Sequence, residues 1–162
     1  MIVNIENIRQ YVMENGVITQ RDRGITRELL SFTATLDPKL FKSYDKSEIT
    51  KYMNMLEKQI PIFRKELKKN RYSRRLFFQF DRFHKNTGFK DFFLCIESFG
   101  VFFHDSKNYD LIINFRSSDI DRLESDVSMI REIARKAVSL ENTTLKKIKI
   151  HCFSLHAYEK SI

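Results

Sequence analysis

The segment Asp110-Leu-Ile-Ile-Asn-Phe-Arg-Ser-Ser-Asp119 decides how the rest of the chain is interpreted. An apolar run typical of a β-strand ends there in Arg116, Ser117 and Asp119, and a helical pattern follows. The planar guanidinium of an arginine matches a phosphate group, and a neighbouring serine adds another donor. This strand end could therefore bind an oxyanion, or its arginine and carboxylate could pair with each other on the surface.

The residues around this segment predict how its strand is connected. Apolar residues recur at steps of three and four from Ile120 onward, which predicts a buried helix. They are Leu123, Val127, Ile130, Ala134 and Ala137. Alternation over Leu145–Tyr158 predicts a last strand. The turn Asp105–Asn108 predicts a hairpin that joins the Phe-rich strand Phe89–His104 to Tyr109–Arg116.

The sequence of the N-terminal half predicts fewer strands and more helix than that of the C-terminal half. In chain order we expect a helix over Asn4–Asn15, a charged turn at Gln20–Gly24, a strand over Arg27–Leu36, a helix capped by Ser47 and ended by Pro61, a basic segment Arg64–Arg75 and a strand over Leu76–Phe80. At 162 residues the chain is long enough for one domain, residues 1–162, with a single core. The predicted fold class is α+β, with a mixed or mostly antiparallel sheet and helices packed on one face.

Composition limits the partners and the setting of the protein. A net charge of +8 and a pI of about 9.5 favour anionic partners such as nucleotides, nucleic acid or acidic lipid. Cys95 and Cys152 are too few for a disulfide framework and lack metal-ligand spacing, so no metal is expected. Glu6 and Arg9 interrupt the one apolar stretch near the N-terminus, and no segment has the length of a membrane span. We therefore expect a cytoplasmic protein that does not bind membranes.

Three further features each allow two interpretations. Cys95 is either a small core residue or a nucleophile activated by a nearby arginine. His156 and Tyr158 share one face of a strand, where they could simply end the strand or could bind a sugar hydroxyl. Ser73-Arg74-Arg75 is either a solvated charge run or part of a nucleic-acid patch with the aromatic residues around it.

Taken together and in this order, these motifs resemble the thymidylate synthase family, including its dCMP and CMP hydroxymethylase branches. The family signature runs from an arginine in a charged turn to Ser-Arg-Arg, a catalytic Cys, Arg-Ser-x-Asp, a helix and His-x-Tyr. The corresponding residues are Arg23, Ser73-Arg74-Arg75, Cys95, Arg116-Ser117-Ser118-Asp119 and His156-Ala157-Tyr158. The resemblance therefore covers most of the chain and implies a thymidylate-synthase-like sheet.

The resemblance also implies a role for each matched residue. Arg23, Arg116 and Ser117 would hold the 5′-phosphate of a pyrimidine nucleotide. Arg74 and Arg75 would reach the same phosphate from a partner subunit, which implies a homodimer formed by sheet-to-sheet packing. His156 and Tyr158 would bind the ribose 3′-hydroxyl.

The same resemblance implies a catalytic group made of Cys95, Asp119 and Asp126. Cys95 would attack C6 of the pyrimidine, so that C5 can accept a one-carbon unit from a tetrahydrofolate. The surrounding arginines would favour the thiolate form of Cys95. With one residue deleted in the preceding loop, Asp126 falls where synthases have an asparagine that reads uracil and hydroxymethylases have an aspartate. A carboxyl group complements the N3 and 4-amino edge of cytosine.

The sequence departs from the family mainly in the half of the site that binds folate. The segment between Arg23 and Ser73 is much shorter than in the full-length enzymes, and it offers no place for the catalytic glutamate or the tryptophans of the folate site.

The sequence as a whole leads to three hypotheses about function. The protein could be a C5 (hydroxy)methyltransferase acting on a cytosine nucleotide, a non-catalytic nucleotide sensor or sequestering protein, or a basic nucleic-acid-binding domain that uses Arg64–Arg75.

Overall fold

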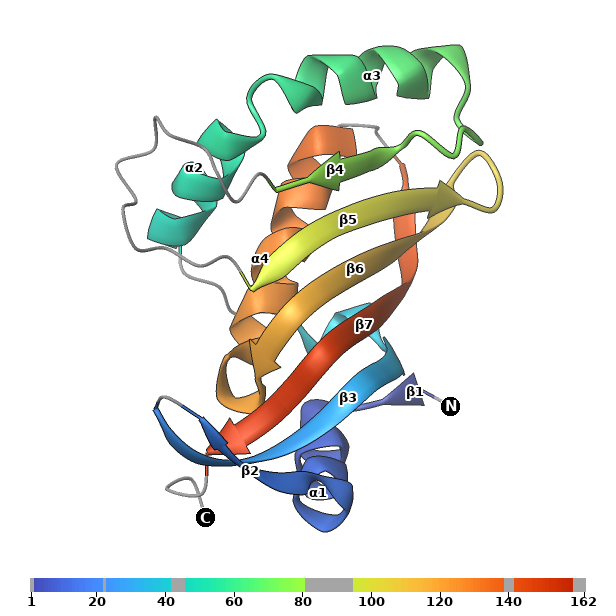
Figure 1. The fold of residues 1–162 in the computed structure, drawn as a ribbon. Helices are drawn as coiled ribbons and strands as arrows, with labels where there is room; N and C mark the ends of the chain where they lie inside the picture. Colours follow the sequence, from blue (N-terminus) through green and yellow to red (C-terminus); the bar gives the residue numbers. More distant parts are fainter. Residues whose placement is uncertain (1, 22, 42–45, 81–94, 139–141, 159–162) are drawn as a thin grey trace.

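The computed structural model describes residues 2–21, 23–41, 46–80, 95–138 and 142–158 (Figure 1). The elements follow one another as β1 (Ile2–Val3), α1 (Ile5–Asn15), β2 (Val17–Arg21), β3 (Gly24–Leu36), a 3₁₀ turn (Pro38–Leu40), α2 (Lys46–Met55), α3 (Gln59–Lys69), β4 (Phe77–Gln79), β5 (Ile96–Phe103), β6 (Asn108–Asp119), α4 (Ile120–Val138) and β7 (Thr144–Tyr158). Within these described ranges, no helix is both long enough and apolar enough to cross a membrane.

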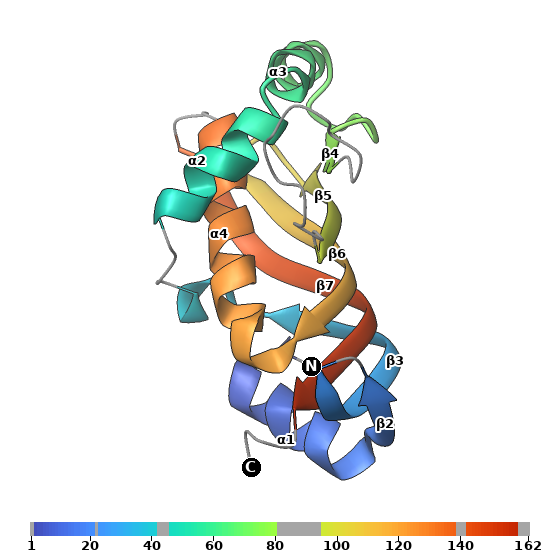
Figure 2. The ribbon, with the colours of Figure 1, turned by 60° about the vertical axis from the view of Figure 1, so that its left-hand side comes forward.

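The strands form one mixed sheet in the order β1-β3-β7-β6-β5-β4, with β2 paired to β3. The pairs β1/β3 and β6/β7 are parallel, and the other pairs are antiparallel. The helices lie on one side of this sheet, as the turned view in Figure 2 shows. The α+β class, the mixed sheet and the single covered face are therefore confirmed.

The core lies between the sheet and α4. Directly paired residues on the central strands form apolar rows, such as Leu36, Ile148 and Leu111 across β3, β7 and β6. All three are fully buried, and so is the predicted stripe of α4 from Leu123 to Ala137. Burial of these two matching surfaces is the main force that holds α4 on the sheet.

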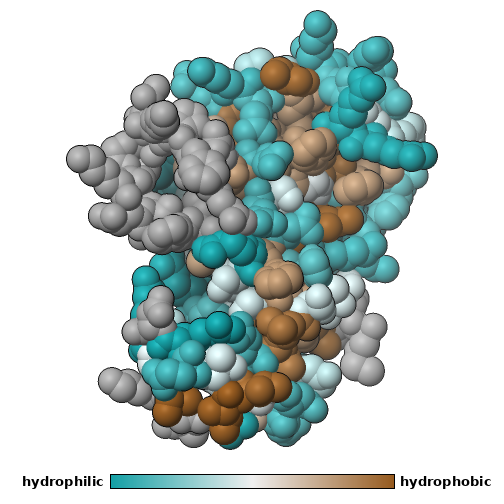
Figure 3. All heavy atoms as spheres, viewed as in Figure 1, coloured by the Kyte–Doolittle hydropathy of each residue, from teal (hydrophilic) through white to brown (hydrophobic). Residues whose placement is uncertain are grey.

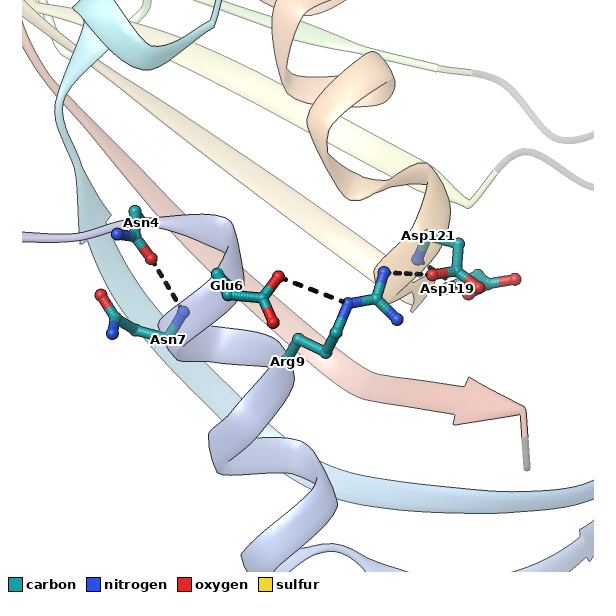
Figure 4. Close-up of polar contacts among 6 residues, drawn as sticks. All are labelled: Asn4, Glu6, Asn7, Arg9, Asp119 and Asp121. Carbon is teal, nitrogen blue, oxygen red and sulfur yellow. Dashed lines mark hydrogen bonds and ion pairs between the residues drawn. The ribbon is translucent and has the colours of Figure 1, made fainter. Parts of the chain in front are cut away.

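α4 is the crossover that parallel pairing of β6 and β7 requires. It begins directly after β6, and the Asp119 carboxylate accepts a hydrogen bond of 3.0 Å from the Asp121 backbone N–H in its first turn. Arg9 of α1 pairs with the Asp121 carboxylate, so the N-terminal helix is tied to the start of α4 (Figure 4). Asn4 caps α1 by accepting a 2.8 Å hydrogen bond from the Asn7 N–H.

The predicted hairpin and strands occur where the sequence places them in the described residues, with two differences. The single helix expected from Ser47 to Pro61 is two helices: α2 begins at Lys46, so Ser47 lies inside it instead of at its cap, and it ends at Met55, while Pro61 lies in the first turn of α3. A proline is tolerated there because the first N–H groups of a helix have no intrahelical partner. β2 was not expected. Of the predicted strand Phe89–His104, the first part up to residue 94 lies outside the described residues.

The outer edge of β3 has an unusual feature. β2 pairs with β3 as far as Glu28 and β1 pairs with it from Thr35, and no described strand pairs with the outer edge between them. In the middle of this stretch Ser31 has a φ of 54°, in the left-handed region. A hollow of about 910 Å³ lies here between α1 and β3, lined by residues such as Asn7, Tyr11 and Lys149. It is separate from the candidate site described below.

Candidate functional site

The face of the sheet that carries the core becomes polar at the C-terminal ends of β6 and β7. Directly paired residues share a face, so the register places Asp119, His156 and Glu28 in one row across three strands, and Ser117 and Ser154 in the row before it. Tyr158 pairs with Thr26 in the row after it. We call this group, Thr26, Glu28, Ser117, Asp119, Ser154, His156 and Tyr158, the polar end of the sheet.

His156 lies between two carboxylates at the polar end. Burial lowers the pKa of His156 below its ordinary value, and the charges of Asp119 and Glu28 oppose this without reversing it. The imidazole is therefore neutral at pH 7. It contacts the Tyr158 ring edge to face, with the ring centroids 5.4 Å apart. The two residues predicted to bind the ribose thus lie side by side, as expected for neighbours on one face of a strand.

Cys95 lies beside a second group of charged side chains. It precedes β5, is partly buried, and its carbonyl accepts a hydrogen bond of 2.8 Å from the Arg116 N–H. The charges that act on its thiol come from Asp126, Arg116, Arg122 and Arg23. The structure therefore brings Cys95, Asp126, Arg23 and Arg116 together, from four separate parts of the chain.

The surroundings of Cys95 as a whole favour its neutral thiol. Burial raises the pKa of the thiol above its ordinary value, and the Asp126 carboxylate raises it further. Arg116, Arg122 and Arg23 act in the opposite direction but are outweighed. The arginines therefore favour the thiolate as expected, but burial and Asp126 outweigh them in the single chain.

Asp126 connects the two groups of side chains. It is buried on α4, and burial raises the pKa of its carboxyl to about 6, with Arg122 opposing the shift and Glu48 and Asp119 adding to it. Asp119 therefore acts on Asp126 as well as on His156, and Arg23 acts on both Cys95 and His156. The polar end and the surroundings of Cys95 form one site.

Helix α2 contributes residues that the sequence analysis did not select. Glu48 pairs with Arg122 at 3.4 Å, and Arg122 lies 3.9 Å from the Asp126 carboxylate. Tyr52 is buried, and its pKa is raised by burial and by the charges of Asp126 and Glu48. Each looks like an ordinary helix residue in the sequence. The sequence does show that Glu48 and Tyr52 are four residues apart and so share one helix face. The same holds for Arg122 and Asp126.

Arg74 and Arg75 are not part of this site in the same chain. They are exposed in the turn before β4. The carbonyl of the next residue, Leu76, accepts a 2.8 Å hydrogen bond from Val101 on β5. At about 3.3 Å per residue, Val101 lies roughly 20 Å along the strand from Cys95. Arg74 and Arg75 therefore lie far from Cys95 within this chain.

Two buried donors of β6 lie next to the polar end in the sequence. The Arg116 Nε and the Ser118 Oγ are buried and make no hydrogen bond within the described residues. Both residues alternate with Ser117 and Asp119 along β6, so their side chains leave the strand on its other face. Buried donors are nearly always hydrogen-bonded in folded proteins. A bound anion would give the Arg116 Nε an acceptor, which it lacks among the described residues. In the part of the chain that the structure describes, no cluster of three or more His, Cys, Asp or Glu side chains could hold a metal ion.

Comparison of the chain with protein-family models gives no match, and comparison with curated proteins also gives none. Any functional assignment therefore depends on the residue types at this site and on their arrangement.

Proposed function

We propose that this chain binds a pyrimidine nucleoside monophosphate at the polar end of its sheet, as a thymidylate-synthase-like protein. The observation that carries this proposal is that residues selected by their order in the sequence lie near one another. Asp119 pairs with His156, and the Arg116 N–H donates to the Cys95 carbonyl. The charges of Arg23 and Asp126 also act on the Cys95 thiol. A surface salt-bridge network alone would not require a thiol, an imidazole and a buried carboxyl to converge.

The phosphate would bind to Arg116 and its neighbours. The Arg116 Nε is buried without a described partner, and Arg23 is exposed between β2 and β3. Ser117, the next residue of β6, leaves the strand on its other face and would have to reach the phosphate around the end of the strand. Arginine forms paired, charge-assisted hydrogen bonds to phosphate oxygens. The phosphate therefore supplies the negative charge that this group of donors lacks.

The rest of the nucleotide would extend toward His156 and Asp126. His156 and Tyr158 would bind the sugar, and Cys95 would lie at C6 of the base. A protonated Asp126 carboxyl can donate to N3 of cytosine and accept from its 4-amino group. Because the pKa of Asp126 is raised to about 6, this protonated form is accessible near neutral pH. The proposal therefore favours a cytosine nucleotide.

A homodimer would complete the site. The face of the sheet without helices carries the exposed side chains of Phe77, Phe102 and Phe153, which are 54%, 45% and 63% exposed. Figure 3 views this face and shows apolar side chains among polar ones on it. Phe77 and Phe102 lie near each other on β4 and β5, and Phe153 lies apart from them on β7. Exposed apolar side chains on one face favour association. Two chains packed through these faces would allow Arg74 and Arg75 of one chain to approach the phosphate bound to the other.

Isothermal titration calorimetry with dCMP, CMP, dUMP and UMP tests this proposal, with cytidine as the ligand that lacks a phosphate. We expect a monophosphate to bind and cytidine to bind at least tenfold more weakly. In the Arg116→Ala variant, a monophosphate should bind no more tightly than cytidine. Arg135→Ala, which removes an exposed arginine paired with Glu132 on α4, is the matched control. If none of the four nucleotides binds, the proposal fails, and oligonucleotides become the ligands to titrate.

The raised pKa of Cys95 favours a second candidate, in which the protein binds the nucleotide without modifying it. Attack of a thiolate on C6 makes C5 basic, and in deuterated water C5 would then exchange its hydrogen for deuterium without any cofactor. Nuclear magnetic resonance of the bound base's H5 signal detects this exchange. Exchange by the native protein but not by Cys95→Ser supports an enzyme, for which the resemblance implies a tetrahydrofolate as one-carbon donor. Tight binding without exchange supports a sensor or sequestering protein.

A further inference from the structure

Glu28 is a buried carboxylate at the polar end that lies outside the predicted set of site residues. It is on β3 directly opposite His156 on β7, and only 8% of its surface is exposed. His156 in turn pairs with Asp119 on its other side. Since paired residues point to the same face, Glu28 borders the position that His156 and Tyr158 would give to the sugar.

The carboxylate of Glu28 is an ionised acceptor. One oxygen accepts a hydrogen bond from the Ser154 hydroxyl and the other accepts from the Arg21 guanidinium. Burial acts to raise the pKa of Glu28, but these two hydrogen bonds and the positive charge of Arg21 bring it below its ordinary value. Each carboxylate oxygen can accept a second hydrogen bond, so acceptor capacity remains next to His156.

A ribose offers a donor that this carboxylate can use. Ribose and deoxyribose differ only at C2′, where the hydroxyl of ribose is adjacent to the 3′-hydroxyl. In dinucleotide-binding folds an acidic side chain accepts a hydrogen bond from a ribose hydroxyl in the same way. We infer that Glu28 accepts a hydrogen bond from the 2′-hydroxyl, so that the site selects ribonucleotides over deoxyribonucleotides. This inference depends on the proposed function.

The size of the selection follows from the burial of Glu28. A site built to hydrogen-bond a substrate hydroxyl discriminates against the analogue that lacks it, most strongly where a buried polar group is then left with no partner at all. Glu28 keeps its bonds to Ser154 and Arg21 in either case, so the loss is one charge-assisted hydrogen bond. We therefore expect CMP to bind at least about tenfold more tightly than dCMP.

Calorimetric titration of CMP and dCMP into three proteins tests the inference. The native chain should show the preference for CMP. Glu28→Gln keeps the size of the side chain but removes its charge. It should lower the affinity for CMP and leave the affinity for dCMP nearly unchanged, so that the preference for CMP falls severalfold. Glu124→Gln, which removes an exposed carboxylate of α4, should leave both affinities unchanged. Circular dichroism establishes that each variant is folded.

A ligand without a 2′ donor makes the test independent of any variant. The 2′-fluoro analogue of CMP cannot donate at C2′, so it should bind the native chain as dCMP does. Equal affinities for CMP, dCMP and the fluoro analogue would overturn the role of Glu28 and leave the proposed function intact. Equal weakening of CMP and dCMP by Glu28→Gln would also overturn it, because a purely structural carboxylate has that effect. If no monophosphate binds at all, the proposed function itself fails.

Discussion

Asp119 on β6 and His156 on β7 are directly paired across two parallel strands, in a row where the sheet is polar instead of apolar. The Asp119 carboxylate also caps the first turn of α4. One side chain therefore has two effects that can be measured separately. It stabilises the helix that carries Asp126, and its charge raises the pKa of His156.

Substitutions of Asp119 should separate these two effects. Asp119→Asn keeps a good cap, so stability should change by less than about 0.5 kcal/mol, but loss of the charge should lower the pKa of His156 further. Asp119→Ala should lower the same pKa and also cost about 1 kcal/mol of stability through loss of the cap. Titration of the His156 ring signal by nuclear magnetic resonance, together with urea unfolding, measures both. An unchanged His156 pKa in both variants would contradict the pairing.

The raised pKa of Asp126 predicts how stability depends on pH. Its carboxyl has a folded-state pKa of about 6 against an ordinary value of 3.8, so the folded state binds more protons than the unfolded state between these values. Stability from this group is therefore fully present below the ordinary value and is lost as the pH rises to about 6. The upper bound is about 3 kcal/mol, at 1.36 kcal/mol per pKa unit.

Asp126→Asn removes this dependence. The variant should be more stable than the native chain at pH 7.5, and the difference should disappear below about pH 4. Urea unfolding at several pH values measures this, with Glu124→Gln as the control that removes an exposed carboxylate. A variant that is equally stabilised at both pH values would show that the effect comes from packing and not from ionisation.

A stack of aromatic rings should determine how firmly α3 is held on the sheet. Phe78 of β4 is fully buried between Phe63 of α3 and Phe99 of β5, with ring centroids 4.5 Å and 4.8 Å away. Phe78→Ala should cost about 3–5 kcal/mol, as is typical of a large core truncation. Tyr72→Ala, at a side chain that is 61% exposed, should cost less than about 0.5 kcal/mol. Similar losses in the two variants would mean that the stack contributes little.

Subunit mixing tests whether Arg74 and Arg75 complete the site of a partner chain. Neither the double variant Arg74→Ala/Arg75→Ala nor Arg116→Ala should bind a monophosphate tightly by itself. A mixed dimer, however, contains one site with all of its arginines, so an equimolar mixture should recover about a quarter of the native sites. Absence of recovery in a mixture that has exchanged subunits would contradict the shared site. Phe153→Asp in both chains should prevent recovery by disrupting the proposed interface.

The sequence predicted the C-terminal half of the fold better than the N-terminal half. The stripe of α4 and the strand β7 have a clear apolar period, because each packs one face against the core, and the hairpin at Asp105–Asn108 has clear turn residues. β2 has no such period, since most of its residues are exposed. Pro61 was taken as the end of a helix because proline both ends and begins helices, and the sequence pattern does not separate the two cases.

The candidate site could be predicted only in part for a similar reason. Arg116, Ser117 and Asp119 end an apolar strand, so their change in character is visible in the sequence. Glu48 and Arg122 look like ordinary surface charges of helices. Arg122 lies one turn before Asp126 on α4, and the packing of α2 beside α4 brings Glu48 to them. The effect of the arginines on Cys95 could be expected from the sequence, whereas the burial that outweighs them is a property of the folded chain.

The left-handed Ser31 gives the open edge of β3 a protective role. An unpaired strand edge can recruit a strand from another molecule and so start aggregation. Ser31 interrupts the regular backbone halfway along the stretch between the β2 and β1 pairings. An incoming strand would find only short pieces of regular edge on either side of it. The chain can thus expose this edge in a crowded solution without extending its sheet into neighbouring molecules.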